Sequence, residues 1–381
     1  MQTRRRMRVA LTVLLLVHGG IHLLGFVKAW GLAAVPQLTG RTVLALSAGA
    51  TRVVGVLWLA ACVLLLGAAA MRVARSPSWW MVAAAGVLLS QALVVLQWHD
   101  AKAGTAANVI LALAVAMAGA TARFEGRAER EARELFARAV AAGSSETVRP
   151  QHLAGLPPPV RRWLDRAGVV GKPLASTVRL RQRGQLHTAP DGPWLPVEAV
   201  QYFGVSEPGF VWWMESRMMK VLPVAGRDKY VAGRGEMLVE LGGLFDVANE
   251  RGDKIDQGAM LRYLAEIIWF PSAALRPYVS WEAVDDRSAK ATMRHEGREV
   301  SAVLTVDAQG RVTEIEARRF FGASGALERW GGRCTEWRVV RGVEIPVRGK
   351  VIWFLQAGDF EFFDWEITDA ESDPATLYDA R

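Results

Sequence analysis

Six polar side chains that could do chemistry lie in or beside apolar runs of the first third of the chain: His18, His22, Gln97, Asp100, Lys102 and Asn108. His18 and His22 are four residues apart and therefore share one face of a helix. Two imidazoles at this spacing can bind a metal ion, but a third ligand would have to come from elsewhere. An unpaired imidazole or amide inside a membrane is costly. The favoured prediction is a structural hydrogen-bond network between helices, and the alternative is a small polar pocket open to the outside.

The depth of these groups follows from the apolar runs that carry them. If the N-terminus lies inside, His22 lies five residues below the outer end of the first run, and Asn108 lies five residues into the fourth. Both are then roughly 7–8 Å deep at ~1.5 Å per residue. We predict that His22 faces the interior of the helix bundle. Its predicted partners, reached directly or through one water, are Asn108, Gln97 or Asp100. The pocket alternative requires His18 in the interior as well.

The second candidate site consists of large apolar side chains near predicted strand centres and a predicted helix end. Ten of the fifteen Trp residues follow residue 123. A concave face lined by such side chains could hold an acyl chain or another apolar ligand. The alternative is that they fill the core. The candidate ligand-binding residues are Trp212, Met214, Trp269, Trp281 and Trp353. If the face proves to be an open groove, Trp212→Ala should weaken ligand binding more than stability.

The sequence contains no GxSxG elbow, HExxH helix, Walker loop or Rossmann glycine fingerprint. Its two cysteines, Cys62 and Cys334, form no CxxC or Cys/His spacing. We therefore predict no catalytic residue, no metal and no cofactor. The second part of the chain carries no basic stripe, so nucleic acid is not an expected partner.

Four uncharged apolar runs must position the first set of side chains. Each has 19 or 20 residues, close to the ~20 that a helix needs to cross a bilayer. The N-terminal run is too long for a signal peptide and is not followed by a cleavage site, so it is predicted to be a retained span. The runs are Val9–Val27, Val53–Met71, Trp79–Trp98 and Ala103–Ala122.

The basic residues predict how these spans are oriented. Residues 1–122 hold ten Lys or Arg and one acidic residue, so the +8 net charge of the chain belongs to this part. Arg residues concentrate in the N-terminal tail, in the 72–78 loop and after the fourth run, and few basic residues lie in the other loops. Because short cytoplasmic loops are enriched in Lys and Arg, both termini are predicted to be cytoplasmic, in a bacterial inner membrane.

Period-two alternation dominates the rest of the chain and predicts roughly ten strands joined as hairpins. Residues 210, 212, 214 and 218 should share one face and 211, 213, 215 and 217 the other. The apolar phase slips between Phe362 and Phe363, which predicts a β-bulge. One helix, 256–269, interrupts the strands, with Asp256 as its N-cap and an Arg262–Glu266 pair on its polar side.

The predicted fold is a four-helix membrane bundle followed by an α+β soluble domain. In that domain a strongly curved antiparallel sheet carries the apolar helix on its concave face. Trp212 and Trp353 should point towards that face. The predicted boundaries are 1–122 for the transmembrane domain, 123–150 for a connecting helix and linker, and 151–381 for the β domain, with the linker itself at 143–149.

Several long stretches resemble one uncharacterised bacterial family that joins four membrane spans to a C-terminal domain of unknown function. They are HGGIHLLGFVKAWGL (18–32), QWHDAKAGTAANVILALA (97–114), LRYLAEIIWFPSAAL (261–275) and VSWEAVDD (279–286). The C-terminal part is also similar to the curved half-barrel of Lol-type lipoprotein carriers, which hold acyl chains under a helical lid. That resemblance implies lipid or lipoprotein handling, although a cytoplasmic domain does not match a periplasmic carrier.

The functional prediction is a membrane protein whose β domain binds an apolar or lipid-like ligand and whose spans contact membrane lipid. One alternative is a membrane enzyme or redox partner that uses the polar groups at the outer ends of the spans. Another is a scaffold for other membrane proteins, whose protein partners the sequence does not identify. An open apolar groove favours ligand binding, whereas a sheet filled by its own side chains favours the scaffold.

Overall fold

The computed structural model describes residues 2–143, 146–190, 192–219, 222–321 and 325–378. The chain divides into two compact units. One comprises Met1–Phe124 with Gly242–Leu244, and the other comprises Glu125–Leu241 with Phe245–Arg381. Part of the predicted linker, residues 144–145, falls outside the described residues.

Unit 1 is helical. Four of its helices are long and apolar enough to cross a membrane, which confirms the four predicted spans. The last of them is longer than predicted, because the fourth span and the charged segment that follows it form one continuous 38-residue helix. The helices are α1 (Gln2–Trp30), α2 (Ala48–Val73), α3 (Trp79–Leu96), the single turn α4 (Trp98–Ala101) and α5 (Gly104–Ala141).

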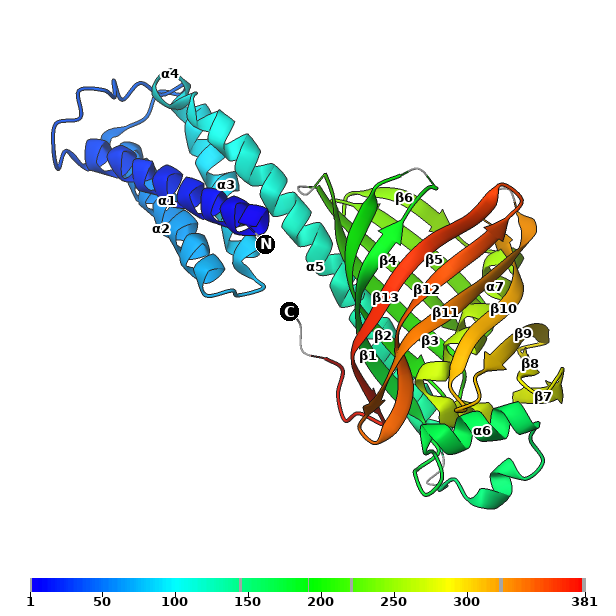
Figure 1. The fold of residues 1–381 in the computed structure, drawn as a ribbon. Helices are drawn as coiled ribbons and strands as arrows, with labels where there is room; N and C mark the ends of the chain where they lie inside the picture. The colour runs from blue at the N-terminus through cyan, green and yellow to red at the C-terminus, as the bar shows by residue number, and fades with distance from the viewer. Residues whose placement is uncertain (1, 144–145, 191, 220–221, 322–324, 379–381) are drawn as a thin grey trace. The chain divides into compact units, whose positions relative to one another are not determined.

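Unit 2 is built on one antiparallel sheet of thirteen strands, three more than the alternation predicted (Figure 1). The strands are β1 (Thr177–His187), β2 (Trp194–Gly204), β3 (Gly209–Met218), β4 (Leu222–Val231), β5 (Arg234–Leu241), β6 (Phe245–Glu250), β7 (Val279–Ala283), β8 (Ser288–His295), β9 (Arg298–Val306), β10 (Val312–Phe321), β11 (Ala326–Val340), β12 (Val343–Leu355) and β13 (Gly358–Ser372).

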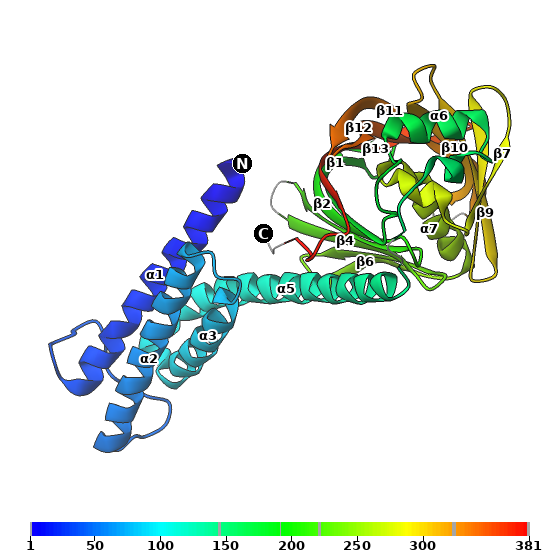
Figure 2. The same cartoon turned by 90° about the horizontal axis from the view of Figure 1, so that it is seen from below.

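The order of the strands shows how the chain builds the sheet. The chain enters at the centre with β1 and passes by hairpins to β6 at one edge. It then crosses to β7 at the other edge and returns by hairpins to β13, which pairs with β1. The crossing consists of α7 (Asp253–Glu266) and the short 3-10 helices η2 (Ile267–Trp269) and η3 (Pro271–Leu275). The sheet curls around α7, which lies on its concave side (Figure 2). The predicted fold class is confirmed.

Two shorter helical segments precede the sheet: η1 (Pro150–Leu153) and α6 (Pro158–Ala167). Helix α6 begins with proline, whose fixed φ suits a first helical turn. It ends at Gly168, which adopts a left-handed φ of 71°. Its buried side, including Trp163 and Leu164, joins the core at one end of the curved sheet. The ring of Trp163 lies 6.1 Å from that of Trp281.

The alternation along β3 sorts its side chains as predicted. Phe210, Trp212 and Met214 belong to the main core with α7 on the concave, inner face. Val211 and Trp213 belong to a second cluster on the outer face, together with residues from the end of α5. The bulge near Phe362 is confirmed, because the register between β12 and β13 shifts there.

The start of α7 differs from the prediction. Gly252, with a φ of 110°, is the residue before the helix, and Asp256 lies within its first turns instead of capping it. The Asp256 carboxylate accepts a hydrogen bond from the Gly235 amide at 2.7 Å and pairs with Arg234 and Arg298. Asp256 is therefore fixed by contacts with distant strands, which local sequence does not reveal.

Candidate functional site

Candidate ligand-binding residues pack into the core of unit 2. Trp212, Met214, Trp269 and Trp353 are at most 8% exposed, and Trp281 is half-buried. Trp269 makes an edge contact with Trp365 at 5.2 Å, whereas Trp353 contacts Phe321 at 4.8 Å. Trp281 donates a hydrogen bond to the Ala274 carbonyl. Four of the five residues are therefore members of one hydrophobic core, and Trp281 packs against it.

The contacts of Trp212 show how one of these side chains is held in the core. Its indole Nε1 donates to the side-chain oxygen of Gln182 at 2.8 Å, and the Arg262 guanidinium lies 4.8 Å from its ring centre. With 8% exposure, this side chain is a structural member of the core. The open-groove condition is not met at Trp212, so its replacement should affect stability first.

A polar chain runs through the inner face beside Trp212. Gln182 donates to Gln201, and Gln201 donates to the Glu266 carboxylate at 2.7 Å. Glu266 forms the predicted pair with Arg262 at 2.8 Å, and Arg262 also reaches Asp228 at 2.7 Å. Burial raises the pKa of Glu266, and the neighbouring Arg262 opposes this shift. Such a network holds α7 in one position on the sheet.

The apolar inner face continues beyond this core towards one end of the sheet. At that end the hairpins β1–β2, β3–β4, β10–β11 and β12–β13 turn, as their registers require. The inward-facing side chains there are only partly covered, with Met218 38% and Leu222 37% exposed. We call these residues the mouth: Leu186, Met218, Leu222, Phe321 and Leu355. Sequence alternation could have located the mouth, because the mouth residues continue the alternating apolar positions of the inner face to the ends of the strands.

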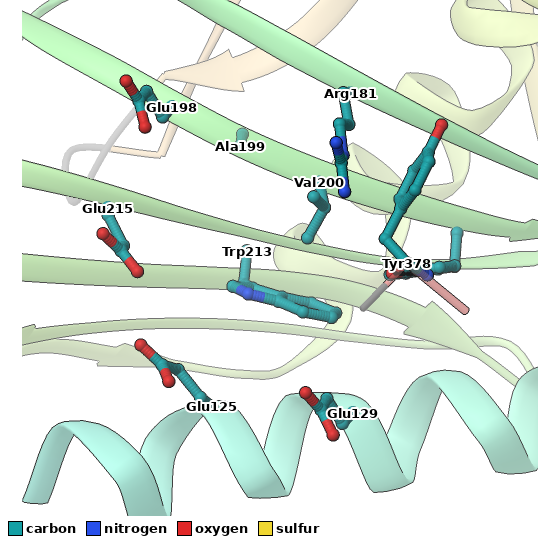
Figure 3. Close-up of a pocket in the computed structure, with 10 residues that line it drawn as sticks. Glu125, Glu129, Arg181, Glu198, Ala199, Val200, Trp213, Glu215 and Tyr378 are labelled. Atoms are coloured by element: carbon teal, nitrogen blue, oxygen red, sulfur yellow. Dashed lines mark hydrogen bonds between the residues drawn. The ribbon is translucent and has the colours of Figure 1, made fainter. Parts of the chain in front are cut away.

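A small pocket of about 60 Å³ lies on the outer face, where α5 crosses β2 and β3 (Figure 3). Four carboxylate side chains line this pocket together with Trp213, Arg181 and Tyr378. The carboxylates belong to Glu125, Glu129, Glu198 and Glu215.

One of these acids titrates near neutrality. Burial, and then the neighbouring Glu215, raise the pKa of Glu125 to about 7. Because the folded pKa is raised, the folded state holds this proton more tightly than the unfolded state does. Protonated Glu125 therefore makes its whole contribution to stability below the ordinary carboxyl pKa. This contribution is lost as the pH rises towards 7.

A larger cavity, of about 510 Å³, lies further along α5 and is lined mainly by charged residues of α5, β4, β5 and the start of α7. Beside it Arg227, only 1% exposed, is held between two carboxylates. Its Nη1 lies 2.5 Å from Glu131, and its Nη2 lies 2.5 Å from Glu236. Burial alone would raise the pKa of Glu236, but Arg251, Lys229 and Arg227 lower it to about 2. We call Glu131, Arg227 and Glu236 the buried triad.

The predicted polar cluster of unit 1 exists in part. His22 and His18 are 2% and 5% exposed, so both face the bundle interior; this was predicted for His22 and required of His18 by the pocket alternative. His18 Nε2 lies 2.8 Å from the Asn108 side-chain oxygen, and Ser90 Oγ donates to the same oxygen at 3.0 Å. Asn108 in turn donates to Gln91. The network joins α1, α3 and α5, which supports the structural interpretation.

The predicted partners of His22 are wrong. His22 Nε2 lies 2.8 Å from Ser90 Oγ, and its Nδ1 lies 2.6 Å from the His18 carbonyl. Asn108 pairs instead with His18, one helical turn from His22, so counting residues from the ends of the apolar runs did not identify the partner. Ser90, fully buried, was missed because a single hydroxyl in an apolar run is a weak signal.

Three residues predicted for this cluster lie elsewhere. Gln97 is the C-cap residue of α3, and Lys102 is exposed in the turn before α5. Asp100 accepts hydrogen bonds from the Thr39 hydroxyl and the Gly40 amide, both at 2.7 Å, and so holds the loop between α1 and α2. Among the described residues, no group of three or more His, Cys, Asp or Glu side chains could hold a metal ion.

Comparison with known sequences places the second part of the chain in a family. A family model described as a family of unknown function (DUF6544) matches residues 146–365. The chain belongs to this family. The match agrees with the sequence-based resemblance of the C-terminal part to a domain of unknown function. No curated protein matches the chain.

Two solved structures are similar to the chain. A DUF1329 family protein from Desulfovibrio piger is 10% identical, with 61% of this chain and 96% of that chain covered and a TM-score of 0.35. A putative outer membrane lipoprotein-sorting protein domain from Vibrio parahaemolyticus is 8% identical, with coverages of 57% and 93% and a TM-score of 0.30. At these identities and TM-scores the similarities imply nothing about ligand or activity.

Proposed function

We propose that this protein is a membrane-anchored binding protein whose curved sheet accepts an apolar or lipid-like ligand at the mouth. The observation that carries the proposal is the partial exposure of inward-facing apolar side chains at the mouth, where the inner face extends beyond the packed core. Leaving such side chains half-covered is unfavourable unless another apolar surface covers them. An acyl chain entering here would contact Leu222 and Phe321 before it met the core.

The filled core defines the limits of this site. Trp212 and Trp353 already have protein neighbours, so a ligand would occupy the mouth and would penetrate further only if core side chains moved. The scaffold alternative is supported by the same filled core. The enzyme alternative loses support, because Gln97, Asp100 and Lys102 do not converge with the histidines.

A photoreactive fatty acid tests the ligand proposal in the full-length protein in phosphatidylcholine vesicles. Diazirine-labelled palmitate should crosslink to mouth residues and not to outer-face residues such as Trp213. Leu222→Arg places a charge in the mouth and should reduce this crosslinking at least fivefold. Val339→Arg, at a residue 63% exposed near the opposite strand ends, is the matched control. Equal labelling of the two variants, or no labelling of the mouth, would contradict the proposal.

We also propose that the β domain lies in the cytoplasm. The Lys and Arg residues flanking the four spans support this side of the membrane. Fluorescent protein fused after Arg381 should fluoresce in cells, whereas alkaline phosphatase at the same position should be inactive. The opposite pair of results would place the domain outside the cytoplasm.

A further inference from the structure

The cavity of about 510 Å³ beside the buried triad is lined by charged side chains that no function described above uses. It lies within unit 2, where α5 meets β4, β5 and the start of α7. Pockets that bind small molecules have volumes of about 300–1,000 Å³, so a small organic ligand fits here. The charged residues of the lining are Glu131, Glu134, Arg138, Lys229, Arg234, Glu236, Arg251 and Asp256.

The acidic side chains of this lining are mostly covered, whereas the basic ones are mostly accessible. The side chains of Glu131, Glu236 and Asp256 are 16%, 8% and 2% exposed. Those of Arg251 and Arg234 are 59% and 73% exposed. A molecule that enters the cavity therefore contacts guanidinium groups more readily than these three carboxylates.

Two of the covered carboxylates have more cations around them than they can neutralise. Glu236 lies within 3.3 Å of four cationic side chains. Glu131 lies within 3.5 Å of three of the same four. Two negative charges therefore face four positive ones, and a negatively charged ligand would neutralise the remainder. The four cations are Arg127, Arg227, Lys229 and Arg251.

Two exposed arginines of the lining keep hydrogen-bond donors available. Arg234 donates from Nη1 to Asp256 at 3.0 Å, and Arg251 donates from Nη2 to Glu236 at 2.7 Å. The described part of the chain gives neither guanidinium another hydrogen bond. A guanidinium has five N–H donors in a planar fork, and this fork matches two oxygens of a phosphate group. Each arginine therefore retains donors for a phosphate.

We propose that this cavity binds an organic phosphate, with its phosphate group on Arg234 and Arg251. A phosphate monoester carries a charge of about −1.5 to −2 at neutral pH, which matches the two surplus positive charges. The apolar residues Leu135 and Val231 line the same cavity and would contact the carbon skeleton of the ligand. This chemistry is common to the headgroup of an anionic lipid and to a soluble phosphate ester. The site does not depend on ligand binding at the mouth.

Isothermal titration calorimetry of the full-length protein in a non-ionic detergent tests the site, with glycerol 3-phosphate as the ligand and glycerol as the uncharged control. The wild type should bind glycerol 3-phosphate and should not bind glycerol. Arg234→Gln and Arg251→Gln should each weaken binding about tenfold, because each removes charge-assisted hydrogen bonds to the phosphate. Arg329→Gln is the matched control, since Arg329 is 55% exposed and pairs with Glu316 at 2.9 Å elsewhere on the sheet. This variant should bind like the wild type.

Glu134→Gln is expected to change binding in the opposite direction. Glu134 is an exposed carboxylate of the lining and repels a phosphate. Its neutralisation should strengthen binding about two- to threefold, the usual size of an effect from an exposed charge. A fold defect could not produce this gain, so the result separates a binding site from a merely structural cluster of charges.

Dihexanoyl phosphatidic acid, titrated in the same way, identifies the source of the phosphate. Tighter binding than that of glycerol 3-phosphate would support a lipid headgroup, and equal or weaker binding would support a soluble phosphate ester. The proposal is overturned if neither compound binds, or if Arg329→Gln weakens binding as much as Arg234→Gln and Arg251→Gln do. Failure of Glu134→Gln to strengthen binding would also overturn it.

Discussion

Arg227→Ala is expected to lower the free energy of unfolding of unit 2 by roughly 3–5 kcal/mol, the usual cost of removing one partner of a buried ion pair. The substitution leaves two carboxylates of the buried triad, on α5 and β5, facing each other without the charge between them. Lys229 lies 3.0 Å from both and compensates in part, which favours the lower end of the range. Chemical unfolding of the detergent-solubilised protein, followed by near-UV circular dichroism, measures the loss.

Arg251→Ala is the matched control. Arg251 also pairs with Glu236, at 2.7 Å, but its side chain is 59% exposed. Its removal should cost less than about 1 kcal/mol, because solvent screens exposed pairs. A similar loss of unfolding free energy in both variants would show that burial does not increase the contribution of Arg227 to stability. Replacing all three residues of the triad by leucine or methionine should recover much of the loss, since apolar packing often substitutes for a buried ion pair.

The spans and the sheet faces were predictable because their signals are local. A helix must be long enough to cross the bilayer, and it must be uncharged, so four runs of 19 or 20 residues were sufficient evidence. The faces of β3 followed from side-chain alternation, which depends only on the pleat of a strand. The bulge at Phe362 was visible for the same reason, as one residue that broke the alternation.

Other features depend on contacts between distant parts of the chain. The pairing of β1 with β13, which joins the two halves of the sheet, brings together residues 177 to 194 positions apart. The buried triad joins Glu131 to residues about 100 positions later, and only the charged composition of the end of α5 hinted at a polar contact there. A polar cluster in unit 1 was predictable from the polar residues in the apolar runs, but the selection of Ser90 as the partner of His22 was not.

The sequence-based prediction and the structure differ most in the role of the aromatic side chains on the inner face. Alternation placed Trp212 and Trp353 correctly on the concave face, but it did not indicate whether that face is empty. Density of packing is a property of all the surrounding side chains together. The structure shows that α7 and the polar chain from Gln182 to Asp228 fill the space beside Trp212. A ligand site therefore has to be sought at the mouth.

Trp212→Ala is accordingly expected to lower the free energy of unfolding by about 3–5 kcal/mol, as for other large-to-small replacements in a core. It creates a cavity, and it removes both the donor to Gln182 and the ring that lies beside Arg262. Trp212→Phe keeps most of the volume and loses the hydrogen bond, so a smaller loss of about 1–3 kcal/mol is expected. The same unfolding measurement applies to both variants.

Comparing variants of Trp212 with variants of the mouth residue Leu222 distinguishes a core residue from a ligand-binding residue. Leu222→Ala changes a side chain that is 37% exposed, so stability should fall by less than about 1 kcal/mol. Labelling by diazirine palmitate should nevertheless fall severalfold, because the lost side chain would contact the ligand directly. Trp212→Phe, which stays folded, should label like the wild type. If it loses labelling while Leu222→Ala retains it, the ligand enters the core past the mouth, and Trp212 binds it directly.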